Sequence, residues 1–411
     1  MQRTESITGL LRDSVAMVLA GGEGQRLYPL TRVRAKPAVR FGGVYRIMDF
    51  TLSNCLHSGL RRIYLMTQYA ATSMARHVYN AWLPLVSEEL DEFIEMLPPQ
   101  RMFADRWYAG TADAVFQNLL VLQEQRPSRV FLLSGDHIYA MDYSQLLARQ
   151  EETGADLVIA CMPRPLEEAR QLGVMQVEEG GRVVGFQEKP EQPAPMPGRP
   201  DRALVNMGVY LWRTETLARK VAEDATRDGS HDFGKDILPR MVEQGEAVSA
   251  YFFYNSENSE PGYWRDIGTL DSYWRTTLDL VGPVPELNLY DETWPVYGSR
   301  LRYPPAKCVS GEQLEITETL LSPGCIISGA RVRGSVLSPG VRVEEGAEVE
   351  TSIVMDRARI GAGAKVTQAI LDEGVEIPPG YEVGGNPERD RKRFVVTEGG
   401  VTVVPAGAMM D

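Results

Sequence analysis

Short apolar runs alternate with amphipathic stretches along the first two-thirds of the chain. Residues 15–20, 61–69, 130–134 and 157–162 are mainly apolar, which is typical of strands buried on both faces. Residues 112–125 carry apolar side chains at helical spacing, with Thr111 as the predicted N-cap and Asp113 near the positive helix end. The alternation predicts an α/β domain with a mostly parallel sheet, where ligands bind beyond the carboxyl ends of the strands.

A different pattern starts near residue 311, where apolar residues recur every 17 positions in three series. The series are Ile326, Val343, Ile360 and Ile377; Val332, Val349, Val366 and Val383; and the pairs at 336–337, 353–354 and 370–371. A fixed period indicates a solenoid. Because 17 is close to three six-residue steps, the pattern predicts a parallel β-helix. A β-sandwich with accidental spacing is the alternative, and the agreement of three series argues against it.

Two proline-rich stretches interrupt these patterns. Residues 191–201 predict an exposed loop. Residues 282–310 have little periodicity and predict a linker; its prolines are Pro283, Pro285, Pro295, Pro304 and Pro305. The sequence therefore divides into a domain at 1–281, a linker at 282–310 and a β-helix at 311–411.

Composition narrows the classes of function. The 411 residues include 43 Lys and Arg against 56 Asp and Glu, a net charge of −13, which argues against nucleic-acid binding. Four cysteines without a Cys-x-x-Cys pair, and four histidines without a His-x-x-x-His pair, argue against a disulfide framework and a zinc site. No apolar leader or membrane-spanning run is evident. We expect a cytoplasmic protein with free thiols and no membrane partner.

A glycine-rich loop follows the first predicted strand. Gly21, Gly22 and Gly24 allow a backbone to approach a phosphate closely. Leu27 replaces the third glycine of the dinucleotide fingerprint, and no Gly-Lys-Ser/Thr follows. Arg26 and Lys36 add positive charge nearby. A phosphate site and a strand-ending turn with surface charges both fit these residues.

Acidic residues follow or precede predicted turns at two further points. Asp136 follows the strand at 130–134, and Asp266 precedes a Gly-Thr turn. Carboxylates hold Mg²⁺, which prefers oxygen ligands, and a turn or N-cap role is the alternative for each. Glu188 and Lys189 precede a loop, where they can bind a sugar phosphate or form a solvated pair.

A series of motifs, in order from about residue 15 to about residue 394, carries a family resemblance. AGGEGQRLYPLT and RAKPA resemble the signature of sugar-nucleotide pyrophosphorylases. The chain is more specifically similar to the bacterial ADP-glucose pyrophosphorylases in FGGVYRIMDFTLSNC, YAGTADAV, SGDHIY, ACMP, QEKP, SHDFGKD and PGYWRDIGT. The resemblance implies a Rossmann-like nucleotide-binding domain followed by a left-handed β-helix. It also implies synthesis of ADP-glucose and pyrophosphate from ATP and glucose 1-phosphate, the first dedicated step of glycogen synthesis.

The same resemblance implies Mg²⁺ as cofactor, a homotetramer, anionic metabolites as effectors, and roles for individual residues. The implied ATP-binding residues are Gly21, Gly22, Gly24 and Tyr108, and the implied catalytic residues are Arg26, Lys36 and Asp136. Asp136 and Asp266 would hold the metal. Glu188, Lys189, Asn206, Asp232 and Trp264 would bind glucose 1-phosphate. Arg40, Arg46 and Arg393, with Arg32, form a hypothetical anion site between the domains; solvated charges are the alternative. We expect the β-helix to serve assembly and regulation.

Two positions depart from the family pattern. Asn206 stands where relatives usually have Ser, and Val33 stands where enteric members have a lysine tied to activation by fructose 1,6-bisphosphate. We therefore expect a monophosphate or a carboxylate as activator. Three other functions stay open: a non-catalytic regulatory subunit, which the presence of Asp136 and Lys189 disfavours; a pyrophosphorylase for UTP or dTTP; and a bifunctional acetyltransferase, for which about four visible coils are too few.

Overall fold

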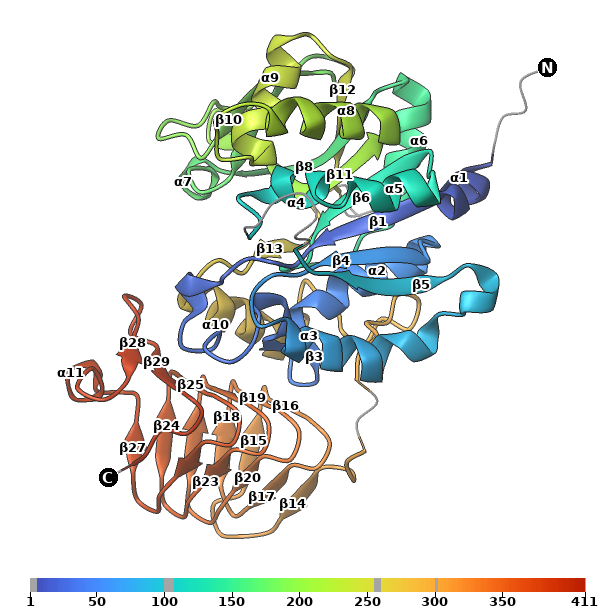
Figure 1. The fold of residues 1–411 in the computed structure, drawn as a ribbon. Helices are drawn as coiled ribbons and strands as arrows, with labels where there is room; N and C mark the ends of the chain where they lie inside the picture. The colour runs from blue at the N-terminus through green and yellow to red at the C-terminus, as the bar shows by residue number, and fades with distance from the viewer. Residues whose placement is uncertain (1–5, 100–106, 255–259, 300–301, 411) are drawn as a thin grey trace.

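The computed structural model describes residues 6–99, 107–254, 260–299 and 302–410. An α/β domain lies against a ladder of β-coils formed by the last hundred residues (Figure 1). The main sheet has nine strands in the order β10-β9-β11-β6-β1-β4-β5, with β8 joining β11 to β12. These strands are β1 (Ser14–Leu19), β4 (Arg62–Met66), β5 (Phe93–Leu97), β6 (Arg129–Ser134), β8 (Leu157–Pro165), β9 (Gly173–Val177), β10 (Val183–Glu188), β11 (Arg202–Arg213) and β12 (Val248–Phe252).

The central strands of this sheet run parallel, as the apolar runs predict. β1 pairs in parallel with both β4 and β6, and β12 pairs in parallel with β8. The long strand β11 runs antiparallel to β6 and β8. All four strands predicted from sequence are present, because continuous Val, Leu and Ile runs suit strands that helices cover on both faces.

Helices cover the two faces of the sheet through two separate apolar clusters. One cluster includes side chains of α1 (Ile7–Asp13), α2 (Ile47–Ser58), α3 (Ala71–His77) and α6 (Ser144–Thr153). The other includes side chains of α4 (Thr111–Phe116), α5 (Leu119–Gln125), α8 (Thr214–Ala225) and α9 (Leu238–Glu243). The shorter elements are β2 (Arg40–Phe41), β3 (Tyr45–Arg46), β7 (His137–Tyr139), β13 (Trp264–Asp266), α7 (Leu166–Ala169) and α10 (Leu270–Leu278).

The single helix predicted at 112–125 is wrong, because two short helices, α4 and α5, occupy that stretch. Gln117 and Asn118 separate them. The Asn118 amide donates to the Tyr108 hydroxyl (2.9 Å) and to the Ala114 carbonyl (2.8 Å), a tertiary contact that periodicity does not reveal. The predicted N-cap is also wrong: Gly110 takes that position, and the Thr111 hydroxyl instead donates to Asp232 (3.0 Å).

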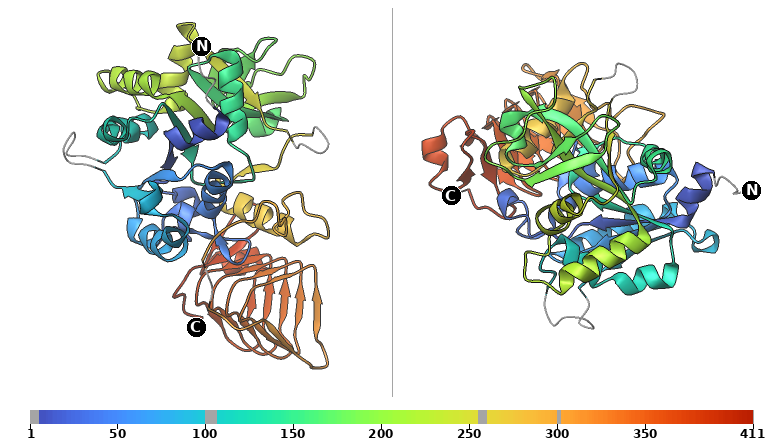
Figure 2. Two further views of the ribbon diagram at one scale, coloured as in Figure 1. Left: turned by 90° about the vertical axis from the view of Figure 1, so that its right-hand side faces the viewer. Right: turned by 90° about the horizontal axis from the view of Figure 1, so that it is seen from above.

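The C-terminal region is a parallel β-helix with three sheets, seen as a ladder in Figure 2. Two sheets have five strands in the described residues, and the third has six. The first sheet contains β14 (Lys307–Val309), β17 (Ile326–Ser328), β20 (Arg342–Val343), β23 (Arg359–Ile360) and β26 (Glu376–Ile377). The second contains β15 (Glu315–Thr317), β18 (Arg331–Arg333), β21 (Glu348–Glu350), β24 (Lys365–Thr367) and β27 (Glu382–Val383). The third contains β16 (Leu320–Leu321), β19 (Val336–Leu337), β22 (Ile353–Val354), β25 (Ala369–Leu371), β28 (Val395–Val396) and β29 (Thr402–Val404), and a short helix, α11 (Pro387–Asp390), precedes β28.

The 17-residue series match the observed stacking, with one correction. Val332, Val349, Val366 and Val383 stack on one another in successive coils. In the series that begins with Ile326, however, Val343 stacks on Ile327, so that step spans only 16 residues. Ile327 is fully buried and Ile326 is not. The first coil begins with β14 at Lys307, inside the stretch predicted as linker.

The two parts of the molecule share an apolar interface. Ile353, Ile370 and Val403 of the third β-helix sheet belong to the same buried cluster as Phe41, Tyr273 and Leu287. Leu287 comes from the proline-rich stretch 282–310, which therefore packs against its surroundings in this region. A shared core of this kind fixes the orientation of the two parts.

In the parts of the chain that the structure describes, no helix combines the length and apolarity that a membrane crossing requires.

Candidate active site

The carboxyl ends of β1 and β6 bring two loops together, as parallel strands do. The glycine loop at 21–24 follows β1, and Asp136 follows β6. The short strand β13 pairs antiparallel with β7, and this register sets Asp266 opposite His137. Two carboxylates that are 130 residues apart in sequence therefore meet at one edge of the sheet.

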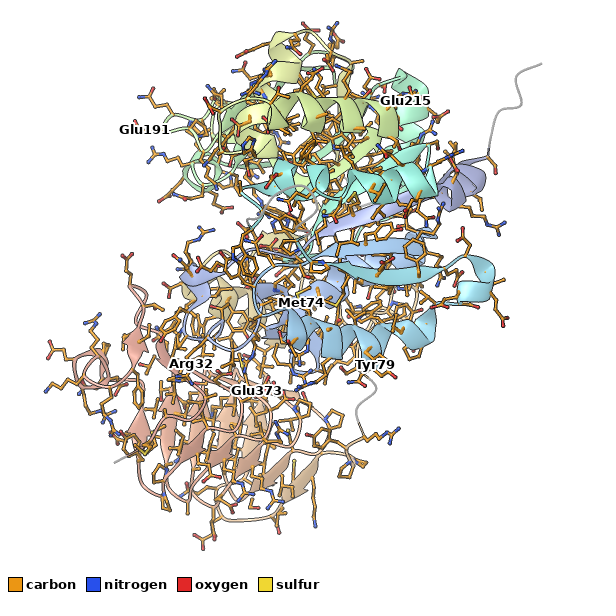
Figure 3. The ribbon with its side chains drawn as sticks, viewed as in Figure 1. Arg32, Met74, Tyr79, Glu191, Glu215 and Glu373 are labelled. Carbon is orange, nitrogen blue, oxygen red and sulfur yellow. The ribbon has the colours of Figure 1, made fainter. Side chains whose placement is uncertain are left out.

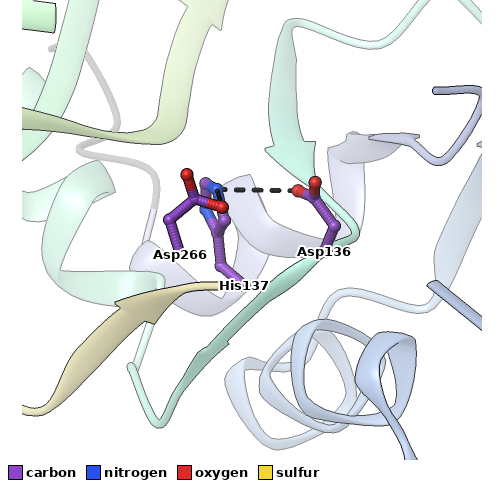
Figure 4. A group of neighbouring side chains, drawn as sticks. All are labelled: Asp136, His137 and Asp266. Atoms are coloured by element: carbon purple, nitrogen blue, oxygen red, sulfur yellow. Dashed lines mark ion pairs between the residues drawn. The ribbon is translucent and has the colours of Figure 1, made fainter. Parts of the chain in front are cut away.

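Asp136, His137 and Asp266 form the only cluster in the described residues with the donor types of a metal site (Figure 4). Their donor atoms all lie within 4.8 Å of one another. The Nε2 of His137 lies 3.5 Å from Asp136 and 3.8 Å from Asp266. Its Nδ1 lies 3.1 Å from the carbonyl oxygen of Met207. If Nδ1 donates to that carbonyl, Nε2 is the acceptor that faces the carboxylates.

Lys36 lies between the two carboxylates. Its Nζ is 2.5 Å from Asp136 Oδ2 and 3.5 Å from Asp266 Oδ1. Burial opposes the charge of Lys36, but the two carboxylates raise its pKa overall. Burial alone would raise the pKa of Asp136, and the Lys36 ammonium instead lowers it to about 2. The two carboxylates thus lie together at one point, with Lys36 between them.

The glycine loop lies directly beside Lys36. Gly24 has a left-handed backbone (φ +66°), and a Cβ there would lie 3.1 Å from Lys36 Cβ. A Cβ on Gly22 would meet nothing within 4 Å, and one on Gly21 would lie 3.2 Å from Gln68 Cβ. The exposed Arg26 reaches over the turn at Gly268, where a Cβ would lie 3.4 Å both from Arg26 Nη2 and from Asp266 Oδ2. The loop, the two cations and the carboxylates thus form one surface.

Tyr108 lies behind this surface, with its hydroxyl directed into the protein. The hydroxyl donates to the Leu97 carbonyl (3.3 Å) and accepts from Asn118. Burial raises the pKa of Tyr108. The Tyr108 backbone N–H donates to the Gln68 side chain (2.9 Å), which itself packs on Gly21. The contact of Tyr108 with the glycine loop is therefore indirect: its backbone N–H binds the Gln68 side chain, which lies beside Gly21.

A cavity of about 200 Å³ adjoins the carboxylate cluster. All five residues assigned to the sugar phosphate line it, together with His137 and Asp266: Glu188, Lys189, Asn206, Asp232 and Trp264. Lys189 is about half exposed at the rim, with Nζ 3.5 Å from the Glu188 carboxylate. Burial, joined by Asp232, raises the pKa of Glu188, although Lys189 opposes that shift. Gly234 leaves room for this carboxylate, because a Cβ there would lie 2.6 Å from Glu188 Oε2.

Two of the cavity residues also hold the backbone around them. Asn206 accepts from the backbone N–H of Gly208 (2.9 Å) and donates to the Tyr210 hydroxyl (2.6 Å). These bonds fix the irregularity in β11, where Gly208 has φ +67°. Asp232 accepts from the backbone N–H groups of Gly234 (2.9 Å) and Lys235 (3.2 Å) and from Thr111. Both side chains are therefore held rigidly before any ligand binds.

Trp264 forms one wall of the cavity and carries a buried indole N–H. Its side chain is buried, and its Nε1 has no hydrogen-bond partner in the described residues. The Arg164 guanidinium donates to the Trp264 carbonyl and lies 5.8 Å from the centre of its ring. His137 and Arg164 had no predicted role, and Thr111 was predicted only as a helix N-cap and not as a site residue. The position of His137 directly after Asp136 was a usable signal, whereas Thr111 and Arg164 meet their partners only through the fold.

The arginines of the expected anion site lie in different surroundings. Arg40 forms an ion pair with Asp356 of the β-helix (2.5 Å). Arg46 is half-buried, and burial together with Arg40 lowers its pKa. Arg393 instead donates to the Tyr381 hydroxyl (2.7 Å) and the Met409 carbonyl (2.8 Å), both within its own domain. Within the described residues these contacts hold Arg393 to its own domain, and its joining Arg40 and Arg46 stays a prediction.

Comparisons with known proteins match both parts of the chain. Residues 15–281 match the family model of nucleotidyl transferases, and residues 304–404 match that of the GlmU-like C-terminal hexapeptide. A glucose-1-phosphate adenylyltransferase of Nitrosomonas europaea is 45% identical over 406 residues, which cover 97% of this chain and 94% of the relative. The enzyme of the same name from Hydrogenovibrio crunogenus is 46% identical over 408 residues, covering 98% and 96%.

Proposed function

The chain belongs to the glucose-1-phosphate adenylyltransferase family, and we propose that the residues around the carboxylate cluster and the adjoining cavity carry out its reaction. The enzyme transfers the adenylyl group of ATP to glucose 1-phosphate and so makes ADP-glucose and pyrophosphate, a reaction that serves glycogen synthesis. One observation carries the assignment of the site. The cluster of Lys36, Asp136 and Asp266 borders the cavity whose walls include every residue assigned to the sugar phosphate.

Two anionic substrates must meet in this site, so cations have to offset their repulsion. We assign Arg26 and Lys36 to the triphosphate, beside the backbone of Gly21, Gly22 and Gly24. The room above Gly22 supports this assignment. Lys189, at the cavity rim, takes the phosphate of glucose 1-phosphate. Its exposed position leaves the ammonium free to swing toward a ligand.

The sugar hydroxyls need donors and acceptors that are fixed in advance. Glu188 and Asp232 supply carboxylate acceptors, Asn206 supplies an amide, and Trp264 forms a wall of the cavity. A phosphate oxygen of the bound sugar then attacks the α-phosphorus of ATP, and the bond to pyrophosphate breaks. No covalent intermediate with the enzyme is required, because positioning and charge neutralisation suffice for such a transfer.

We assign Asp136 and Asp266 as the residues that hold Mg²⁺. Two carboxylates whose charge Lys36 only partly offsets suit a hard cation that prefers oxygen ligands. When bound, Mg²⁺ supplies further neutralisation of phosphate charge. His137 Nε2 lies 3.5 Å from Asp136 and 3.8 Å from Asp266, so we assign it as a further donor atom beside the two carboxylates.

The test is release of pyrophosphate by the purified enzyme with glucose 1-phosphate and, in turn, ATP, UTP and dTTP. Activity that depends on ATP supports the assignment. Equal or higher activity with UTP or dTTP would contradict it and favour a different pyrophosphorylase. No turnover with any nucleotide would favour the non-catalytic alternative.

We also propose that the β-helix mediates assembly into a homotetramer. The first coil supports this proposal, since β14 and β15 are largely exposed, and Val309 and Leu314 are each 36% exposed. An uncovered sheet edge tends to be paired or covered in a stable protein. Light scattering of the purified chain gives its mass directly, and a monomeric mass would contradict the proposal.

An anionic effector remains part of the proposal, with Arg46 as its main ligand. In the described residues Arg46 forms no ion pair, and its Nε has no hydrogen-bond partner. Arg40 is adjacent but is already neutralised by Asp356. Val33 is exposed and offers no charge. We expect activation by fructose 6-phosphate or pyruvate rather than by fructose 1,6-bisphosphate. Arg46→Ala should lose this activation. Stronger activation by fructose 1,6-bisphosphate would contradict the argument that the uncharged Val33 disfavours a bisphosphate.

We propose a cytoplasmic location as well. Its support is that all four cysteines are free and three of them are buried, since disulfides are rare in reducing compartments.

A further inference from the structure

We propose that residues 294–299, called the strap below, position the metal-site segment at 134–141 through the side chain of Asn54. The strap belongs to the stretch that leads from the catalytic domain to the β-helix. The metal-site segment carries Asp136 and His137. Helix α2 lies between the two and contacts both.

The strap is fastened to α2 by several contacts. The Trp294 indole N–H donates to Asn54 Oδ1 (3.0 Å), and the Tyr297 backbone N–H donates to the Ser53 hydroxyl (2.8 Å). The His57 Nε2 lies 2.7 Å from the Pro295 carbonyl oxygen. The His57 ring packs against both aromatic rings of the strap, with centroids 4.6 Å from Trp294 and 5.1 Å from Tyr297.

The other side of α2 holds the metal-site segment before and after its ligands. The Thr51 hydroxyl donates to the Ser134 carbonyl (3.0 Å), two residues before Asp136. The Asn54 amide donates to the Tyr139 carbonyl (3.1 Å), and Asn54 Oδ1 accepts from the Met141 backbone N–H (3.2 Å). Asn54 is 1% exposed, so water cannot replace a partner that is lost.

Asn54 therefore joins three chain segments in one buried hydrogen-bond network. Its Oδ1 accepts from the strap and from the metal-site segment, and its Nδ2 donates to the same segment. By bonding to Asn54 Oδ1, the Trp294 N–H holds the Asn54 side chain in the rotamer that forms both bonds to the metal-site segment. Asn54 and Trp294 are positioning residues, since neither lies in the carboxylate cluster or lines the sugar cavity.

The experiment compares Trp294→Phe with Trp274→Phe in the full-length enzyme. The first change removes the N–H bonded to Asn54 and keeps an aromatic ring beside His57. The second is a matched control, because the Trp274 indole N–H donates over a similar distance (2.9 Å) to the Thr351 carbonyl of the β-helix. In the described residues it takes no part in the hydrogen bonds of Asn54. Hydrogen exchange by mass spectrometry is measured without substrates or metal, and the Mg²⁺ dependence of turnover is measured separately.

We expect Trp294→Phe, and not Trp274→Phe, to speed exchange in peptides covering 134–141. We also expect it to raise the Mg²⁺ concentration for half-maximal turnover by about 2- to 10-fold, the equivalent of one lost hydrogen bond. Exchange over 134–141 that matches the control would overturn the inference. The inference rests on the proposed function only for the metal role of Asp136. Faster exchange with an unchanged Mg²⁺ requirement would support the positioning and count against that metal role.

If Trp294→Phe does not fold, Ser53→Ala provides the same test. It removes the acceptor of the Tyr297 N–H and so loosens the strap without altering Asn54. Faster exchange over 134–141 in this variant supports the inference, and unchanged exchange contradicts it.

Discussion

Lys36 is the residue whose surroundings explain most about the site before substrates bind. A lysine that is 9% exposed would ordinarily lose its proton more easily, because burial disfavours charge. Two carboxylates reverse that effect and raise its pKa. In return, the Lys36 ammonium lowers the pKa of Asp136 to about 2 and contacts both carboxylates, which holds the two side chains close together.

Asp136→Asn should fold and lose most turnover. The amide fills the same volume but binds Mg²⁺ poorly, so we expect a loss of about 100-fold or more in kcat even at saturating Mg²⁺. The buried Lys36 also loses its closest partner, which should lower the free energy of unfolding by about 1–3 kcal/mol. Steady-state kinetics and denaturant unfolding measure the two effects. Asp201→Asn, at an exposed loop position, is the control and should change neither.

Lys189→Ala should weaken the binding of one substrate only. Because Lys189 lies at the rim of the cavity and beside Glu188, its loss should raise the KM for glucose 1-phosphate by about 10-fold or more, with little change for ATP. Initial rates over both substrate concentrations test this. Equal effects on the two KM values would indicate a structural role, and the exposed Lys365→Ala on the β-helix controls for loss of surface charge.

Glu188→Gln should stabilise the fold at neutral pH while weakening sugar binding. Burial raises the pKa of Glu188 above its ordinary value of 4.5. The folded state therefore keeps this proton at pH values where the unfolded chain has lost it, so the group's contribution to stability falls as pH rises through the raised pKa. The amide has no such dependence.

The gain in stability of Glu188→Gln should consequently shrink as the pH is lowered toward 4.5. Thermal unfolding at pH 7.5 and at pH values approaching 4.5 measures it. A gain that is constant over this range would contradict the argument. Glu178→Gln, at an exposed position outside the sugar cavity, should leave stability unchanged at both ends of this pH range.

At the scale of elements, apolar runs and fixed periods were reliable because burial alone determines them. The four predicted strands lie where expected, and the valine series at 332, 349, 366 and 383 stacks as predicted. The series containing Ile326 fails at its first member because one coil is a residue shorter and its neighbour Ile327 faces inward. A sequence with isoleucine at both positions gives no signal of which one is buried.

Elements fixed by distant partners could not be predicted in the same way. The break between α4 and α5 depends on Asn118 meeting the Tyr108 hydroxyl. The strap was predicted only as proline-rich linker, since Trp294 and Tyr297 find their partners on α2, about 240 residues earlier in the chain. Within the site, strand ends indicated Asp136, but the pairing of β13 with β7 that brings Asp266 to it had no local signal.

The β-helix offers a prediction about where its stability lies. Ile360 is fully buried within the coils, whereas Ile316 in the first coil is only partly buried. Ile360→Val should cost about 0.5–1.5 kcal/mol of unfolding free energy, and Ile316→Val clearly less. Denaturant unfolding of the two variants tests this. An equal cost at Ile316 would indicate that a second copy covers the first coil in the assembled enzyme.

At the scale of the whole molecule, buried charge and apolar surface tie the two parts together. Arg34 forms an ion pair with Asp372 of the β-helix (2.6 Å) and lies 3.6 Å from Glu373. Figure 3 labels Arg32 and Glu373 at this junction, where Arg32 also donates to the Ala406 carbonyl (2.6 Å). With the shared apolar cluster beneath them, these contacts argue for one cooperative unfolding transition rather than two.

Arg34→Met should therefore destabilise the entire chain. Removing one partner of a buried pair leaves the Asp372 charge uncompensated, which costs about 3–5 kcal/mol. Neutralising that charge as well, in Arg34→Met/Asp372→Asn, should recover part of the loss. The matched control is Arg331→Met, because Arg331 and Glu348 are also 2.6 Å apart but more exposed, and such a pair is worth less than about 1 kcal/mol. Calorimetry distinguishes the outcomes. A single transition at lower temperature fits a shared core. An early transition of one part alone would show instead that the β-helix and the catalytic domain unfold independently.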